Sequence, residues 1–271
     1  MRCRLFPVFD ALVYPGKPDS ASLGLSSIHI IDRNTDGTTP PNEASVRQQI
    51  ATISQTDPYP VIVFDIEVKQ YPFDIRFSTQ ALVNATIKYC TQLINWTKSA
   101  NPNAKVGFYG VAPVQDYWTT NLYNSALSRA DPIWVAQLAG YQKNFLAWQN
   151  ASAYMTPLIA QVDYLFPVFY TFYDIYESAP NGPNYHGWKD AALLAIAEAR
   201  KYNKPIYPFI WPQFHPGGAH KDYSYIPVDY WAKQLKFALR NADGVVLWGS
   251  GGFLHETWND TAPWWQAVTS I

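Results

Sequence analysis

Two carboxylates stand two residues apart at the end of an apolar segment that suits a buried strand. Residues 61–64 are Val-Ile-Val-Phe, and Asp65 and Glu67 follow where that strand should end. In a strand, residues i and i+2 point to the same face, so both acids would enter one pocket while Ile66 points the opposite way. Aromatic walls disfavour the charged form of a carboxyl group, so one acid of such a pair could serve as a general acid. The alternative is that Asp65 caps a turn and Glu67 is a solvated loop residue.

Aromatic residues stand at the ends of three other apolar runs. Tyr109 follows Gly107-Phe108, Tyr170 closes residues 166–170, and Trp248 precedes Gly249-Ser250. A single aromatic side chain at a strand end commonly plugs the core. Three of them around two acids are typical of a carbohydrate subsite, because flat apolar faces pack on sugar rings.

The elements that would hold these residues alternate along the chain. Seven apolar runs predict strands, at residues 5–13, 27–31, 61–66, 105–109, 164–170, 205–210 and 245–248. Helical spacing of apolar residues predicts helices at residues 42–52, 80–99, 132–162, 188–202 and 230–240, the third being one long helix or a broken pair. A last helix is expected at residues 256–265, with Trp264 and Trp265 packed in the core.

This order favours a parallel α/β sheet in a single domain over residues 1–271, with no internal repeat or linker. An open nucleotide-binding sheet usually shows a Gly-rich turn after its first strand, and Tyr14-Pro-Gly-Lys-Pro18 offers none. We therefore predict a closed (β/α) TIM-like barrel. Barrel enzymes build their sites at the carboxyl ends of the strands, which is where the two acids and three aromatic residues fall.

Composition excludes several classes of partner. The chain of 271 residues has a net charge of −1 and no basic run, so it predicts no binding to nucleic acid or to an anionic membrane surface. No apolar stretch reaches the roughly 18 residues of a membrane span, and the apolar run in residues 1–16 is short and contains Pro and Asp, so we do not expect it to act as a signal peptide. Cys3 and Cys90 allow one disulfide but no cysteine-based zinc site. His215 and His220 lack an evident third ligand, so we predict neither a metal nor a cofactor.

Four short motifs follow one another along the sequence. They are Asp65-Ile66-Glu67 (D-x-E), Gly107-Phe108-Tyr109 (G-[FYW]-Y), Pro167-Val168-Phe169-Tyr170 (P-x-x-Y) and Trp248-Gly249-Ser250 (W-G-[SD]). Together they resemble the hyaluronidase family of glycoside hydrolases, family 56, over about residues 42–250. The resemblance implies a seven-stranded variant of the (β/α) barrel and a polysaccharide substrate. We further expect a monomer that is extracellular or secretory.

The resemblance also implies a mechanism and its residues. Glu67 would protonate the glycosidic oxygen and later act as base, while the N-acetyl oxygen of the substrate attacks the anomeric carbon with overall retention. Asp65 would orient that N-acetyl group and stabilise its developing positive charge. Tyr170 would hydrogen-bond near the same oxygen, Tyr109 would hold the sugar, and Trp248 would wall the pocket for the acetyl methyl group.

The sequence departs from the family pattern in ways that leave the glycan open. Members usually have D-[WF]-E followed by W-R-P, whereas this chain has Ile66 and continues as residues 68–72, Val-Lys-Gln-Tyr-Pro. The usual disulfides of the family cannot form with two cysteines. A polyanion such as hyaluronan would call for cationic side chains in the cleft, and the candidates are Lys69, Arg76 and Lys221.

Further residues define the alternatives. Trp211 and Phe214, in the loop after the sixth predicted strand, could stack on a flanking sugar, and His215 could contact sugar. If the substrate lacks an N-acetyl group, Asp174 or Glu177 would supply the second carboxylate on a neutral or sulfated glycan. A third possibility is a barrel that binds an oligosaccharide without cleaving it, although a pure binding protein gains little from desolvating two acids.

Overall fold

The computed structural model describes residues 6–32, 41–67, 71–116, 123, 132–176, 187–218 and 223–270. Its strands form two regular sheets, in which every pair of neighbouring strands is parallel. One sheet has the order β2-β1-β7-β6 and the other the order β3-β4-β5. The strands are β1 (Val8–Val13), β2 (Ser26–Ser27), β3 (His29–Asp32), β4 (Val61–Asp65), β5 (Lys105–Phe108), β6 (Phe209–Ile210) and β7 (Val245–Ser250).

The two sheets are connected around a ring. On one side, β2 pairs with β1 and β3 pairs with β4, and only Ile28 separates β2 from β3. On the other side, residues 164–171 make parallel bridges to both neighbours, Tyr109 with Phe166 and Val168 with Phe209. The described pairings therefore follow seven strand positions around a TIM-like α/β barrel, which confirms the predicted fold class.

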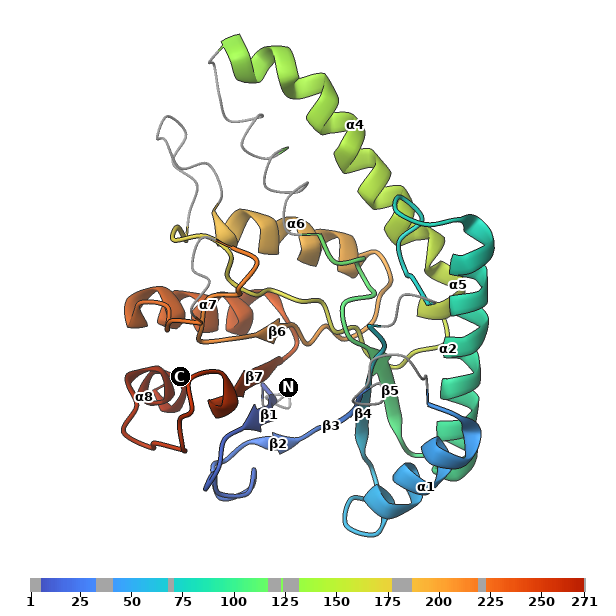
Figure 1. Cartoon of the computed structure of the whole chain (residues 1–271), viewed down its shortest axis with the longest axis vertical. Helices are drawn as coiled ribbons and strands as arrows, with labels where there is room; N and C mark the ends of the chain where they lie inside the picture. The colour runs from blue at the N-terminus through green and yellow to red at the C-terminus, as the bar shows by residue number, and fades with distance from the viewer. Residues whose placement is uncertain are drawn as a thin grey trace, which may run out of the picture.

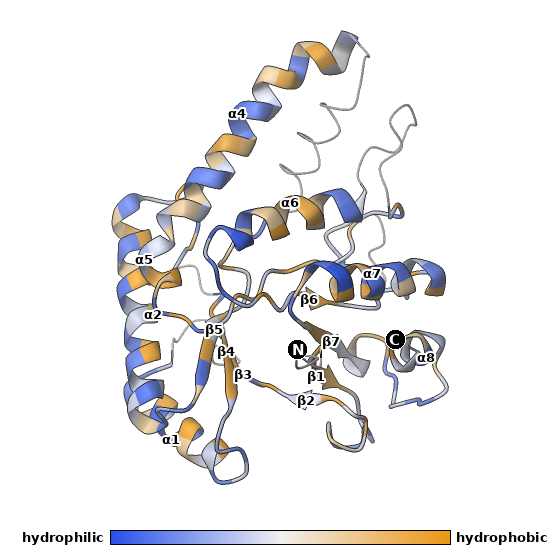
Figure 2. Cartoon of the chain, turned by 180° about the vertical axis from the view of Figure 1, so that it is seen from behind, coloured by the Kyte–Doolittle hydropathy of each residue, from blue (hydrophilic) through white to orange (hydrophobic). Residues whose placement is uncertain are grey.

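Helices cover the outside of the strands (Figure 1). Helices α1 and α2 contact each other beside β3, β4 and β5, and α7 contacts α6 and α8. Figure 2 shows hydrophobic residues along β4 and alternation of hydrophilic and hydrophobic residues along the helices. The helices are α1 (Glu43–Ser54), α2 (Gln80–Ala100), α4 (Pro132–Tyr154), α5 (Thr156–Ile159), α6 (Trp188–Arg200), α7 (Val228–Asn241) and α8 (Pro263–Thr269), with a 3-10 turn η1 (Gly251–Phe253).

Proline explains where the predicted elements and the structure differ. The run at residues 164–170 contains Pro167 and forms isolated bridges instead of a regular strand, because proline has no N–H for the ladder. Pro205 and Pro208 likewise leave β6 only two residues long. The segment 132–162 is a broken pair, α4 and α5, and α4 projects away from the barrel (Figure 1). Helix α8 begins at Pro263, later than expected.

Alternation along β4 divides its side chains between two apolar clusters. Ile62, Phe64 and Ile66 belong to the larger cluster between strands and helices, together with Trp264 and Trp265 as predicted. Val63 belongs to the second cluster, which contains inner-facing side chains of other strands such as Phe9, Phe166, Phe209 and Val246. The odd-numbered residues of this segment thus face the inside of the barrel, which aims Asp65 and Glu67 at its mouth.

Candidate active site

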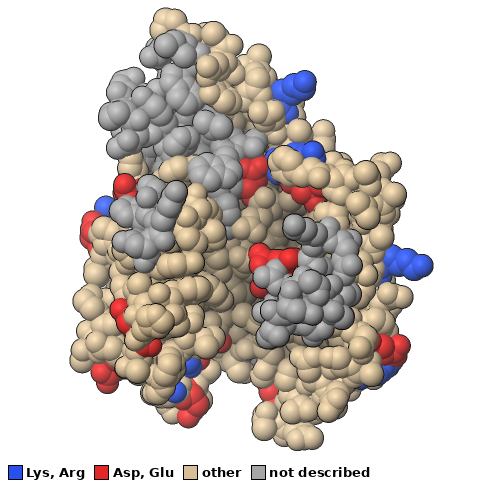
Figure 3. All heavy atoms as spheres, in the orientation of Figure 1, with Lys and Arg blue, Asp and Glu red and all other residues tan. Residues whose placement is uncertain are grey.

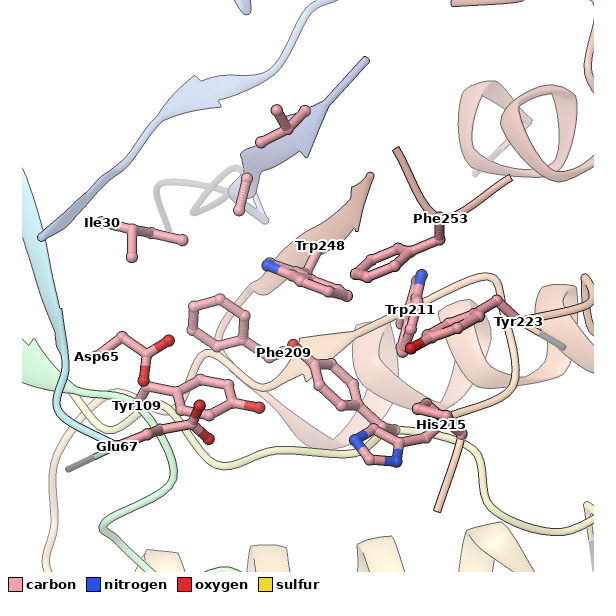
Figure 4. A pocket seen from close by; sticks show the side chains of 14 residues that line it. Ile30, Asp65, Glu67, Tyr109, Phe209, Trp211, His215, Tyr223, Trp248 and Phe253 are labelled. Atoms are coloured by element: carbon pink, nitrogen blue, oxygen red, sulfur yellow. The ribbon is translucent and has the colours of Figure 1, made fainter. Parts of the chain in front are cut away.

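Asp65 and Glu67 lie together where β4 ends. Both line a cavity of about 450 Å³, and Figure 4 shows their carboxyl groups pointing toward the ring of Tyr109. Asp65 is half-buried and Glu67 is exposed to the opening. In the space-filling view a groove crosses this face of the molecule, with acidic side chains along it (Figure 3). The predicted convergence of the two acids is therefore present.

Aromatic side chains from neighbouring strands complete the cavity. Tyr109 follows β5, Tyr170 lies in the segment 164–171, and Trp248 lies on β7. The ring of Trp248 packs edge-on against Trp211, with centroids 4.6 Å apart, and tilts against Tyr170 at 5.5 Å. The indole N–H of Trp211 donates to Gln213 Oε1 at 2.7 Å, which fixes that ring. These contacts give the cavity rigid walls.

The charges of Asp65 and Glu67 act on the phenol group of Tyr109. Burial raises the pKa of Tyr109 well above its usual range, and Tyr170 and the charges of Asp65 and Glu67 raise the pKa of the same hydroxyl further. The Tyr109 hydroxyl therefore lies near the carboxylates and stays a protonated hydrogen-bond donor at neutral pH.

His215 forms a further wall of the cavity. Its ring stacks on Tyr170, with centroids 5.8 Å apart, and on Phe172 at 4.4 Å. Its Nδ1 accepts a hydrogen bond from the backbone N–H of Gly217 at 3.1 Å. Burial lowers the pKa of His215, so the neutral imidazole is favoured in the folded protein.

The structure brings most of the predicted site residues together. Tyr109, Tyr170, Trp211 and Trp248 all line the cavity that holds the two acids. Asp174 is exposed and is not among the residues that line this cavity. Phe214 is buried in the larger core cluster and does not line the cavity either. Other candidates lie outside the described residues, namely Lys69, Glu177, His220 and Lys221.

Arg76 is engaged in an ion-pair cluster beside the site. Its guanidinium donates to Asp74 Oδ2 and to Asp116 Oδ2, each at 2.6 Å. The side chains of Arg76 and Asp116 are only 12% and 6% exposed. The Arg76 guanidinium is thus paired with two carboxylates. These ion pairs hold the loop that follows β4 against the segment after β5.

Three aromatic residues of the cavity wall were not predicted from the sequence. Phe209, Tyr223 and Phe253 line the cavity, and the rings of the last two stack at 4.6 Å with planes 9° apart. The inward position of Phe209 on β6 could have been found from strand alternation, since Ile210 packs outward in the larger cluster. Tyr223 and Phe253 carried no signal, because one lies in the loop before α7 and the other in the turn η1, and the path of both segments depends on the folded barrel.

A smaller cavity of about 380 Å³ opens on the other side of Glu67. Glu67 and Tyr109 line both cavities. Its remaining wall includes Tyr71, Phe73 and Phe77, of which Phe77 is 82% exposed. The candidate acid therefore stands between two adjoining spaces.

Within the described ranges, no group of three His, Cys, Asp or Glu side chains could hold a metal ion. Cys90 is buried with a free thiol, and Cys3 lies outside the described residues. None of the helices in the described part of the chain is long and apolar enough to cross a membrane.

Comparisons with known proteins point to the fold. No protein-family model matches the sequence, and no curated protein matches it. Among solved structures, a crystal structure of bee venom hyaluronidase aligns with a TM-score of 0.54 and 15% identity, covering 91% of this chain and 92% of that one. The same bee enzyme in complex with a hyaluronic acid tetramer aligns with a TM-score of 0.53 and 14% identity, covering 91% of each chain. At this identity the likeness shows a shared barrel fold.

Proposed function

We propose that this protein is an endo-acting glycoside hydrolase that cleaves β-linked N-acetylhexosamine bonds in a polysaccharide by a substrate-assisted retaining mechanism. The observation that carries the proposal is the position of Asp65 and Glu67, which face one aromatic cavity at the barrel mouth. The bee venom enzyme with a similar fold is a hyaluronidase, which supports the reaction class by analogy.

The position of Glu67 supports its role as the acid. A group that protonates a glycosidic oxygen must stand between the two sugars that the bond joins, and Glu67 lines both adjoining cavities. The larger cavity would hold the sugar whose anomeric carbon reacts, and the smaller one would hold the leaving sugar. Space on both sides of the acid is what cleavage within a chain requires.

The remaining groups suit attack by an N-acetyl oxygen. Asp65 lies on the same face as Glu67, where it would accept a hydrogen bond from the N-acetyl N–H and stabilise the positive charge that forms on this group. Tyr109 and Tyr170 would donate hydrogen bonds near the reacting sugar, and Trp248 would pack on the acetyl methyl group. Glu67 would then activate the water that opens the cyclic intermediate.

The carboxylates of the site favour this scheme over a mechanism with an enzyme nucleophile. Among the described residues, two carboxylates line the larger of these cavities, Asp65 and Glu67. Asp174 does not line it. Asp74, in the smaller cavity, is paired with Arg76. Glu177 lies outside the described residues, so trapping of a covalent glycosyl-enzyme remains the test for a second carboxylate.

A screen of reducing-end release tests the proposal. Hyaluronan, chondroitin, chitin-type glycans and sulfated glycans are offered to the wild type, to Glu67→Gln and to Asp65→Asn. We expect Glu67→Gln to lose at least about 1,000-fold in kcat/KM and Asp65→Asn about 100-fold or more, since each removes charge or proton transfer from the transition state. Glu43→Gln makes the same chemical change at an exposed position of helix α1 and serves as the control. Full activity of Glu67→Gln, or binding of glycans without any release by the wild type, would contradict the proposal.

A further inference from the structure

A third cavity, larger than the two at the candidate active site, is not used by the proposed reaction. It measures about 620 Å³ and shares no lining residue with the cavity of Asp65 and Glu67. Its walls come from the end of β1, the loop before α7, the loop after η1 and the start of α8. We call it the side cavity.

Two segments contribute to the walls of both cavities and form a partition between them. Tyr223 and Phe253 line the active cavity, and two residues further along each segment Tyr225 and His255 line the side cavity. Tyr223 and His255 both adopt left-handed backbone conformations, with φ of 58° and 56°. Such conformations cost about 1–3 kcal/mol each in non-glycine residues and cluster at ligand sites. The fold therefore holds this partition in a strained shape on both of its segments.

The floor of the side cavity is aromatic. The rings of Tyr225 and Trp264 are parallel within 9°, with centroids 6.3 Å apart. Tyr14, the residue after β1, stacks on Trp264 with centroids 5.7 Å apart. Val228, at the first turn of α7, adds an aliphatic edge that is 44% exposed. Tyr14 and Trp264 are only 7% and 5% exposed, so they support Tyr225 from behind, and the partly exposed ring of Tyr225 offers the apolar surface that the C–H face of a sugar ring can contact.

The rim of the side cavity is polar and carries a carboxylate. Glu256 Oε2 accepts a hydrogen bond of 2.6 Å from the Tyr225 hydroxyl, and no hydrogen bond within the described residues occupies Oε1. The Glu256 backbone N–H donates to Gly251 O at 2.8 Å, and a Cβ at Gly251 would collide with the Glu256 carbonyl oxygen. The loop is thus closely packed, and it holds an acceptor ready for sugar hydroxyl groups.

We propose that the side cavity binds a sugar unit of the polysaccharide at a distance from the cleaved bond. The chain would cross the partition, where Phe253 is 38% exposed and can pack against it, and would place one unit between the aromatic floor and Glu256. This inference rests on the proposed function. It predicts that a long chain binds more tightly than a short fragment that occupies only the active cavity.

The test measures binding separately from hydrolysis. In a Glu67→Gln background, calorimetry compares polymeric hyaluronan, chondroitin and glycol chitin with their four-sugar fragments. Val228→Arg fills the side cavity from an exposed position and brings a cation to Glu256, and Glu256→Ala removes the acceptor. We expect each change to weaken binding of the preferred polymer about tenfold and to alter binding of its fragment less than about twofold.

The control is Tyr59→Ala. Tyr59 is 71% exposed and precedes β4, at the amino ends of the strands and away from both cavities. Unchanged polymer affinity in folded Val228→Arg would overturn the inference, as would failure of all three polymers to bind the parent. If the wild type hydrolyses none of them but Val228→Arg still loses polymer binding, the proposed reaction is wrong and the side cavity remains a glycan site.

Discussion

The rings of Tyr109 and Tyr170 lie with centroids 6.2 Å apart, on neighbouring positions of the barrel and in the same cavity as the two acids. Removing either hydroxyl group leaves its ring in place. We expect Tyr109→Phe and Tyr170→Phe each to lower kcat/KM about 10- to 100-fold, because a hydrogen bond to a charged or reacting group is worth about 1.5–3 kcal/mol. Steady-state kinetics on the glycan found by the screen measures the loss. Wild-type kinetics in both variants would show that these hydroxyls do not touch the sugar.

Gly107 on β5 allows the close approach of a core ring. A Cβ at this position would lie 2.5 Å from two ring atoms of Phe166 and 2.6 Å from the Tyr164 carbonyl oxygen. We expect Gly107→Ala to lower the free energy of unfolding by about 1–3 kcal/mol or more, because a well-packed core cannot take the added methyl group. Denaturant unfolding of the variant and the wild type measures this change in the free energy of unfolding.

Gly140 provides the matched control for that substitution. It lies within helix α4, and a Cβ there meets no atom within 4 Å. Gly140→Ala should therefore stabilise the protein by up to about 1 kcal/mol through helix propensity. Equal effects of the two substitutions would contradict the packing described at Gly107.

The ion pairs of Arg76 are expected to matter for stability. Arg76→Ala would leave Asp74 and the buried Asp116 without their cation, and breaking a buried pair on one side costs about 3–5 kcal/mol. Arg47→Ala removes an exposed pair with Glu43 on α1 and should cost less than about 1 kcal/mol. Urea unfolding of the two variants gives the comparison, and similar losses would show that the Arg76 cluster is open to solvent.

The lowered pKa of His215 predicts how the free energy of unfolding depends on pH. Burial lowers its pKa in the folded protein, so the unfolded chain binds a proton at a higher pH than the folded chain does. The contribution of neutral His215 is complete above the unfolded value of about 6.5 and is lost as the pH falls toward the folded value. We expect His215→Gln to flatten the decrease in unfolding free energy below that pH. An unchanged slope in this variant would show that His215 does not titrate in this way.

Local alternation allowed several features to be predicted from the sequence. Residues 61–67 read as a strand with one apolar face and two acids on the other, and Ile66 does pack outward while Asp65 and Glu67 face the cavity. Helix α2 was predicted to begin at Gln80, and Thr79 caps it through Leu82 N. Such features depend on neighbours within a few residues, which the sequence displays directly.

Other features depended on contacts between distant segments. Pro167 prevented a regular strand at residues 164–170, yet the segment keeps its place in the ring through bridges to Tyr109 and Phe209 of its neighbours. Asp174 follows Tyr170 by only four residues but lies outside the cavity, because the chain leaves the barrel mouth after this strand position.

By itself, therefore, the sequence determined the barrel class, the face on which Asp65 and Glu67 project and the aromatic residues that end the other strands. Only the tertiary structure decided that Phe209, Tyr223 and Phe253 complete the cavity, that Arg76 is held by Asp74 and Asp116, and that Glu67 stands between two spaces. The physical reason is that the periodicity of a strand sets only the direction of a side chain, whereas its neighbours are set by the order in which distant strands and loops close the ring.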